Sequence, residues 1–362
     1  MRIIRDYVAK NIRKIDLKFS RYPMIFSNPD EVLERGYASS ADSAVLLLSM
    51  LKALNLADNC QILLLSEFGR INNCQNYWSK ILTDRFTDIL IYRPEKYDGT
   101  KLVQSGFMLN GSSQYGDISE FPKNNCDYLN TAGAEIENFG NNIHNERQKE
   151  FEITINNDNS ADVEAIYSYS GAYFGEINKF YQSATNEERI RFMKSLESEI
   201  AMQAESVSRS YDADYDKGIA EIKLKVHIDN FVRKSGNFYY FELPEFIELA
   251  DFIRLGSEKR SENYLLKQLN YNRSNYRIKF PTDCKYIDCN ENIDFNNYSL
   301  HYVCNYASAR GGNGLEVENF INASETLLSP DEYYNLLNLN KQCGKKIQKT
   351  VIFTKNSGKN LQ

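Results

Sequence analysis

The sequence predicts an α+β protein of two domains, and three observations support this. The chain has 362 residues, more than one hydrophobic core usually serves, because single cores stop growing at a few hundred residues. Residues 40–54 are rich in helix formers and apolar on most sides, which is typical of a buried helix. Short apolar runs typical of strands follow it, and strict alternation of apolar and polar residues begins near residue 150.

Composition and charge exclude several classes of function. Hydrophobic residues make up 42% of the chain and aromatic residues 13%, with only 7 Pro and 18 Gly, which is a globular profile. The net charge is −6 and the basic residues are scattered, so we expect no nucleic-acid partner. The longest apolar run, residues 44–51, is far shorter than the ~20 residues of a membrane helix, so no transmembrane segment is expected.

The N-terminus and the cysteines bear on localisation and cofactors. The first ten residues are charged throughout and lack the apolar core of an export signal, so the chain as written is expected to be cytoplasmic. Seven cysteines, an odd number without a CxxC pair, fit reduced thiols better than disulfides or a zinc site. We therefore expect no metal and no cofactor.

The order of patterns along the chain predicts the domain boundaries. We expect a core over residues 1–123, a polar, Asn-rich linker over 124–148, and a β-rich domain over 149–362. Apolar and polar residues alternate at 151–155, 222–228, 276–280 and 300–304, which predicts half-buried antiparallel strands and a β-sandwich-like body for that domain, with a helical insert at about 172–204. Within the insert, Thr185 and Glu188 have the spacing of a capping box, and Ser329-Pro330 predicts the start of a further capped helix.

Residues 29–47, PDEVLERGYASSADSAVLL, resemble the active-site segment of bacterial transglutaminase-like proteins, which have a papain-type fold. Those proteins show Pro-x-Glu-Val-Leu, a basic residue, and then Gly-Asp-Cys-Lys-Asp before an apolar helix. The catalytic cysteine of the family falls on Ser40 here, while Asp42 keeps the second Asp of the motif. The resemblance therefore implies a central helix packed on an antiparallel sheet, with Ser40 at the nucleophile position.

Two later segments resemble the rest of the family's catalytic triad. Residues 86–91, FTDILI, are similar to the strand that carries the catalytic His, and Asp88 occupies the His position. Residues 107–112, FMLNGS, are similar to the segment of the third member, where Asn110 replaces Asp, and YGDI at 115–118 continues that segment. The likeness extends, with less specific motifs, into a β-rich domain of unknown function that such proteins append, whereas we expect no counterpart in this sequence of the β-domain that they commonly carry upstream.

The replacements predict a loss of catalysis. A papain-type nucleophile is a thiolate at a helix N-terminus, and a serine hydroxyl needs a general base instead. The three histidines, His144, His227 and His301, all lie beyond the first domain. Asp88 is a weak base for an alcohol because the reference pKa of a carboxyl group is about 4. Asn110 alone is tolerable, since papain-like triads can use Asn as the orienting residue.

These observations leave three hypotheses open. The first is an inactive transglutaminase-like protein that binds a protein, peptide or glycan partner in its cleft or on the β-rich domain. In that case Ser39 or Ser40 serves as a helix cap, and Asn110 belongs to a turn. The second is a weak amidase or acyltransferase that uses Ser40. The third is the C-terminal part of a longer envelope protein, which would move the expected localisation to the periplasm or envelope.

Overall fold

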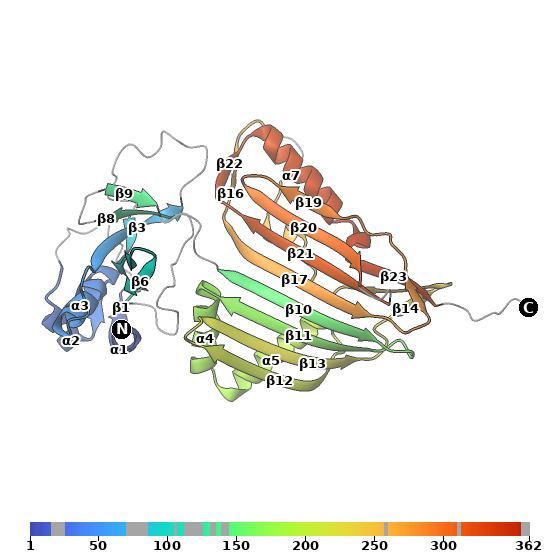
Figure 1. Ribbon diagram of the computed structural model, residues 1–362, viewed down its shortest axis with the longest axis horizontal. Helices are drawn as coiled ribbons and strands as arrows, with labels where there is room; N and C mark the ends of the chain where they lie inside the picture. Colours follow the sequence, from blue (N-terminus) through green and yellow to red (C-terminus); the bar gives the residue numbers. More distant parts are fainter. Residues whose placement is uncertain are drawn as a thin grey trace, which may run out of the picture. The chain divides into compact units, whose positions relative to one another are not determined.

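The computed structural model describes residues 1–15, 26–69, 86–104, 107–111, 126–130, 135–138, 145–256, 260–309 and 313–355. The chain divides into two compact units. The first comprises Met1–Asn145, Ser170–Gln182 and Asp214–Ile219, and the second comprises Glu146–Tyr169, Ser183–Ala213 and Ala220–Gln362. Helices and largely antiparallel sheets make the fold α+β, as the sequence predicts (Figure 1). Within the described residues, no helix is long and apolar enough to cross a membrane.

Three helices open the first unit: α1 (Arg2–Asn11), α2 (Pro29–Arg35) and α3 (Ser40–Ala53). The start of α2 is set by the Asn28 side chain, which accepts a hydrogen bond from the amide of Asp30 at 3.1 Å. Gly36 ends this helix with a φ of +68°, a left-handed conformation that glycine adopts without steric cost. The chain can therefore turn sharply into α3, the longest helix described in this unit.

A five-stranded antiparallel sheet faces α3, in the order β7-β4-β3-β8-β9. Its strands are β3 (Gln61–Gly69), β4 (Phe86–Arg93), β7 (Phe107–Leu109), β8 (Cys126–Asn130) and β9 (Glu135–Asn138). Strands β8 and β9 lie within residues 124–148, where the sequence suggested a linker. They are short and polar, and pairing of β8 with β3 incorporates them into the sheet although their own sequence has little apolar alternation.

Two small β-elements complete the first unit. Strand β1 (Arg13–Lys14) pairs in parallel with β2 (Tyr37–Ala38), which joins the segment after α1 to the segment before α3. Strands β5 (Lys96–Asp98) and β6 (Lys101–Gln104) form a hairpin beyond β4.

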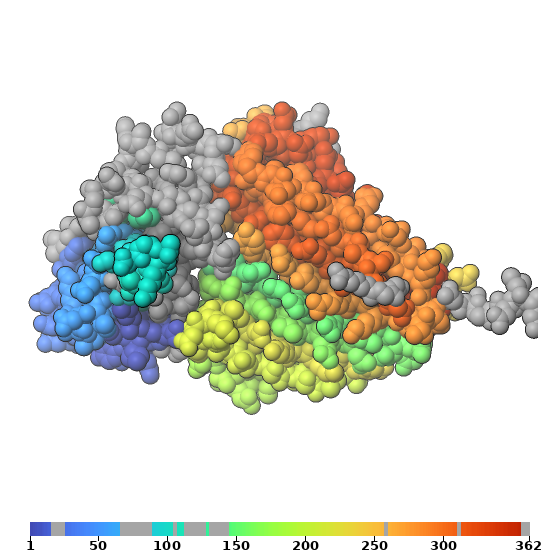
Figure 2. All heavy atoms as spheres, viewed as in Figure 1, coloured from blue at the N-terminus to red at the C-terminus, as the bar shows by residue number. Residues whose placement is uncertain are grey.

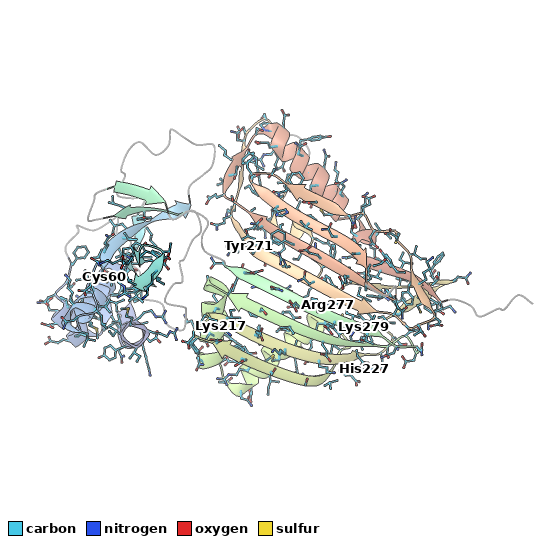
Figure 3. All side chains as sticks on the ribbon, in the orientation of Figure 1. Cys60, Lys217, His227, Tyr271, Arg277 and Lys279 are labelled. Atoms are coloured by element: carbon cyan, nitrogen blue, oxygen red, sulfur yellow. The ribbon has the colours of Figure 1, made fainter. Side chains whose placement is uncertain are left out.

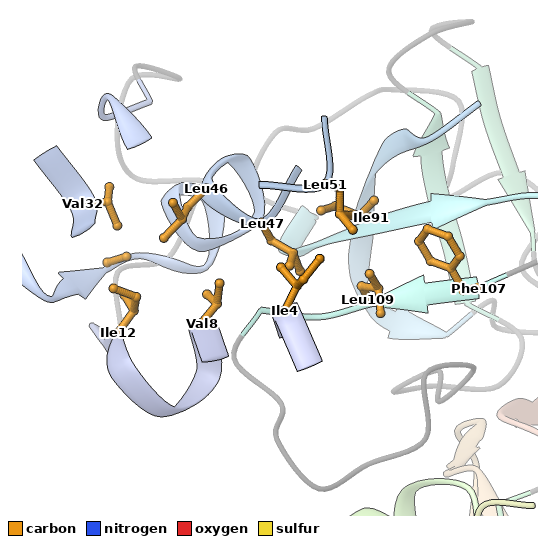
Figure 4. Close-up of a cluster of buried hydrophobic side chains, with 11 residues drawn as sticks. Ile4, Val8, Ile12, Val32, Leu46, Leu47, Leu51, Ile91, Phe107 and Leu109 are labelled. Carbon is orange, nitrogen blue, oxygen red and sulfur yellow. The ribbon is translucent and has the colours of Figure 1, made fainter. Parts of the chain in front are cut away.

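The core of the first unit joins α3 to its neighbours. Leu46, Leu47 and Leu51 of α3 pack in one buried cluster with side chains from α1, α2, β4 and β7 (Figure 4). Leu47 and Leu51 are fully buried, and each such side chain contributes about 1.5–3 kcal/mol relative to an exposed one. A helix that is apolar on most sides is thus buried against both helices and sheet, as the sequence predicts.

An eight-stranded sheet dominates the second unit, in the order β12-β13-β11-β10-β17-β21-β20-β19 (Figure 1). Its strands are β10 (Glu146–Ile155), β11 (Ala161–Ser170), β12 (Glu205–Asp214), β13 (Ile219–Ile228), β17 (Leu269–Lys279), β19 (Ile293–Asn296), β20 (Leu300–Ser308) and β21 (Gly314–Ala323). Strands β10 and β17 pair in parallel, so the sheet is mixed and the expectation of antiparallel strands throughout is wrong at this pair.

A smaller antiparallel sheet, in the order β14-β15-β23-β18, belongs to the same unit. Its strands are β14 (Arg233–Ser235), β15 (Phe238–Glu242), β18 (Cys284–Tyr286) and β23 (Thr350–Lys355). Strands β16 (Tyr264–Leu266) and β22 (Thr326–Leu328) form a separate pair. Helices α4 (Ala172–Ser183) and α5 (Asn186–Ile200) fall in the range expected for the helical insert, although nearly all of α4 groups with the first unit. Helix α5 begins with the predicted capping box at Thr185.

One face of the large sheet is buried by mixed elements. The hydroxyls of Tyr276 and Tyr302 donate to the carbonyls of Pro244 and Ile247, so the segment between β15 and helix α6 (Leu249–Phe252) lies under the sheet. The Phe280 ring packs against Phe353 of β23 with centroids 5.1 Å apart. Helix α7 (Pro330–Cys343) and the short helix η3 (Lys346–Lys349) precede β23. The architecture is therefore one large sheet with a composite cover, which differs from a sandwich of two matched sheets.

Candidate functional site

Ser40 is the first residue of α3, and its neighbour Ser39 is the helix cap. The Ser39 hydroxyl accepts a hydrogen bond from the amide of Asp42 at 3.1 Å. Ser40 is half-buried, and its hydroxyl makes no hydrogen bond within the part of the chain that the structure describes. Capping therefore explains Ser39 and leaves the Ser40 hydroxyl at the positive end of the helix dipole.

Asp42 anchors the segment that leads into α3. Its carboxylate accepts hydrogen bonds from the backbone amide of Ser27 at 2.8 Å and from Arg35 Nη2 at 3.1 Å. Arg35 also donates through Nε to the carbonyl of Tyr37 at 2.8 Å and lies over the ring of Tyr37. A charged pair with further hydrogen bonds resists motion better than an isolated surface pair. The first turn of α3 is thus fixed in position.

Asn110 follows directly after β7, beside the first turn of α3. The next residue, Gly111, is so close to the helix that a Cβ built on it would lie 3.2 Å from the carbonyl oxygen and 3.3 Å from the Cβ of Ser43. A glycine at this point permits the chain after β7 to approach the helix that begins at Ser40. The structure therefore brings the Asn110 and Ser40 segments together, whereas residues 115–118 lie outside the described residues.

Asp88 is in β4, and the structure describes its backbone position alone. It pairs with Leu65 of β3, and the following residue, Ile89, packs in a buried cluster with Ala41 and Ala44 of α3. Strand β4 also pairs with β7, Ile91 opposite Leu109. The three positions predicted from the resemblance therefore lie on α3, β4 and the end of β7, which contact one another, and on β4 it is Ile89, next to Asp88, whose side chain packs against α3.

The residues that could act as base or nucleophile are placed elsewhere. His227 is in β13 and His301 in β20, both on the polar face of the large sheet of the second unit, with side chains 35% exposed; His144 lies outside the described residues. Cys60 follows α3, and burial raises the pKa of its thiol. Such a thiol is a poor nucleophile at neutral pH. Among the described residues, no group of three or more His, Cys, Asp or Glu side chains is arranged to hold a metal ion.

A partly buried charged cluster in the second unit was not predicted from the sequence. Glu245 has a φ of +46°, which is uncommon for a residue with a Cβ. Its carboxylate pairs with Lys149 and accepts a hydrogen bond from the Tyr167 hydroxyl at 2.6 Å. Burial, and then the nearby Glu245 carboxylate, raise the pKa of Glu199. The cluster joins β10, β11, α5 and the segment after β15, and no local sequence signal connects residues so far apart.

Comparisons with known proteins give a likeness of fold. No family model matches the sequence, and no curated protein matches it. Among solved structures, a protein from Parabacteroides distasonis described as a "putative protease" is similar, with a TM-score of 0.50 and 13% sequence identity. The match covers 97% of this chain and 51% of that chain, so this chain spans about half the length of the structure it matches. At this identity the likeness concerns the fold alone.

Proposed function

We propose that this chain is a catalytically inactive, transglutaminase-like protein with a papain-type core, and that it acts as a binding module for a protein, peptide or glycan partner. One observation carries the proposal: a serine stands at the start of α3, where a papain-type enzyme has its thiolate. The contacts among α3, β4 and β7 support the comparison, because they bring the segments of Ser40, Asp88 and Asn110 to one end of the helix.

The chemistry around Ser40 supports inactivity. A serine hydroxyl attacks a carbonyl efficiently only when a general base removes its proton. The position that resembles the catalytic His holds Asp88, and no histidine precedes residue 144 in the sequence. Asn110 could orient a base but cannot replace one. A retained fold without nucleophile and base is best suited to binding.

A second candidate is a weak serine-dependent amidase or acyltransferase. The observation that favours it is that Ser39 provides the helix cap, so the Ser40 hydroxyl is free of that role. The fold likeness to a protein described as a protease is compatible with it. This candidate still requires a base that Asp88 would have to supply.

An amide-hydrolysis and transamidation assay separates the two candidates. Fluorogenic Gln and acyl-amide substrates are incubated with the wild-type chain, with Ser40→Ala and with Ser49→Ala, a serine on the third turn of the same helix. Inactivity predicts the same background rate for all three proteins. Turnover by the wild type and Ser49→Ala that disappears in Ser40→Ala would establish the second candidate and refute the first.

A further inference from the structure

The outer face of the eight-stranded sheet in the second unit holds a hollow that the proposed core site does not involve. Side chains alternate along the strands, so the other face carries the buried side chains while this one is polar. Figures 1 and 2 view the sheet face-on. The hollow has a volume of about 320 Å³ and crosses β10, β17, β21 and β20. Figure 3 places Arg277 on β17 on this face.

Strand register builds the hollow from two cross-strand rows. In the first row Glu150, Asn275, Glu318 and Asn305 lie opposite one another on successive strands. In the second row the corresponding residues are Glu152, Arg277, Glu316 and Ala307. The short side chains of Asn275, Asn305 and Ala307 leave space between the longer Glu and Arg side chains, which explains why the surface is depressed here.

Charge within the hollow is unbalanced. Arg277 is the cation among the lining residues, and it already pairs with Glu152 at 3.4 Å. Glu318 lies 3.9 Å from Arg273, which flanks the hollow. For Glu150 and Glu316 no cation lies within ion-pair distance among the residues that the structure describes; Glu150 instead accepts a hydrogen bond from Gln148 at 2.6 Å. Two carboxylates therefore face the hollow without a counter-ion from the described chain.

We infer that this hollow binds a short, extended, cationic peptide segment, with Lys or Arg side chains against Glu150 and Glu316. A ligand that covers the hollow removes water from these carboxylates, and an unpaired, desolvated charge is costly. A cationic side chain offsets that cost, whereas a neutral saccharide does not. Asn275 and Asn305 offer amide donors and acceptors for a peptide backbone.

The dimensions fit such a segment. Four neighbouring strands at about 4.8 Å spacing span roughly 14 Å, which is the length of about four residues of extended chain. Glu150 and Glu316 are two strands apart and in neighbouring rows, which places them roughly 12 Å apart, similar to the distance between the first and last residues of a five-residue extended peptide. The inference names the partner of the binding role proposed above, although it depends only on residues of the second unit.

Binding of defined peptides tests the inference. Blocked Lys-Gly-Lys-Gly-Lys carrying an uncharged dye is titrated with the full chain at low salt and followed by fluorescence anisotropy. Glu150→Gln and Glu316→Gln are each expected to weaken binding several-fold and together about tenfold or more, since 1.4 kcal/mol corresponds to a factor of ten. Glu164→Gln removes the same charge from the same face but outside the hollow, beside Lys225, and should change affinity less than about twofold.

Three results would overturn the inference. The first is that the peptide does not bind. The second is that Glu164→Gln weakens peptide binding as much as Glu316→Gln does. The third is that a neutral pentasaccharide binds instead, with the same dependence on Glu150 and Glu316. Circular dichroism of each variant checks that it is folded. Activity at Ser40 is measured separately, so failure here is distinguishable from failure of the proposed inactivity.

Discussion

Replacing Ser40 by cysteine tests whether the start of α3 is a papain-type nucleophile position. A free thiol has a pKa of about 8.5, and a helix N-terminus stabilises a half-buried anion by about 1–2 kcal/mol. One pKa unit corresponds to 1.36 kcal/mol, so the thiol introduced by Ser40→Cys should have a pKa of roughly 7.5. The charge of Asp42, two residues away in the same turn, is offset by Arg35 at 3.1 Å and should not reverse this shift.

Adding Asp88→His to Ser40→Cys tests whether position 88 can supply a base. An imidazolium about 4 Å from the thiolate would contribute about 4 kcal/mol at an effective dielectric constant of 20, which corresponds to roughly three further pKa units. Because Ile89 packs against α3 and side chains alternate along a strand, we expect little further change in the pKa of the thiol. The pH dependence of iodoacetamide alkylation, followed by peptide mass spectrometry, reports the pKa of each thiol. Ser49→Cys is the matched control, since Ser49 is half-buried in the middle of α3.

Two outcomes would refute the reasoning. A Ser40→Cys thiol that reacts with the same pH dependence as the Ser49→Cys thiol would show that the helix start does not stabilise an anion. A further fall of about three pKa units on adding Asp88→His would show that position 88 faces the helix start and can carry a base.

Three further predictions concern single contacts. Ser39→Ala should lower the free energy of unfolding by about 1 kcal/mol through loss of the helix cap, whereas Ser40→Ala should have little effect. Equal losses for the two variants in denaturant titrations would contradict the assignment of Ser39 as the cap. Glu245→Gln should lower the free energy of unfolding by roughly 3 kcal/mol because it leaves a largely buried lysine unpaired. Glu164→Gln removes a charge from an exposed pair and should have a much smaller effect, so similar losses for the two variants would argue against the partly buried cluster. The pKa of His227 is raised, first by its hydrogen bond to Asp162, so its contribution to stability is complete below about pH 6.5 and is lost as the pH rises through the folded-state pKa. Asp162→Asn should bring that pKa down in an NMR titration while Glu164→Gln does not, and a pKa that stays raised in Asp162→Asn would refute this cause.

Local signals predicted most of the individual elements. The capping box at Thr185 and the serine-proline start of α7 identify helices by chemistry within four residues, and both helices begin there. Apolar alternation around Ile153 and Leu224 likewise identifies β10 and β13 and their buried faces. These features depend on nearest neighbours along the chain, which is why the sequence reveals them.

Features that depend on pairing between distant segments could not be predicted. Alternation in β10 and β17 shows that each is a strand, but it does not reveal that Phe151 lies beside Tyr276 in a parallel pair. The outer-face hollow requires Glu150 and Glu318 to share a row, although they are far apart in the sequence. The Asn-rich region around β8 lacks an alternating pattern, so its pairing with β3 was missed.

Inactivity requires that Ser40 has Asn110 beside it but no base within reach. A crystallographic measurement of the separations of Ser40 Oγ from the Asp88 carboxylate and from the Asn110 side-chain amide tests this most directly. Ile89 packs against α3 and side chains alternate along a strand, so we expect the Asp88 carboxylate well beyond the roughly 2.6–3.2 Å of a nucleophile–base hydrogen bond, and the Asn110 amide on the side of Ser40. A carboxylate within that distance of the hydroxyl would contradict the proposed inactivity.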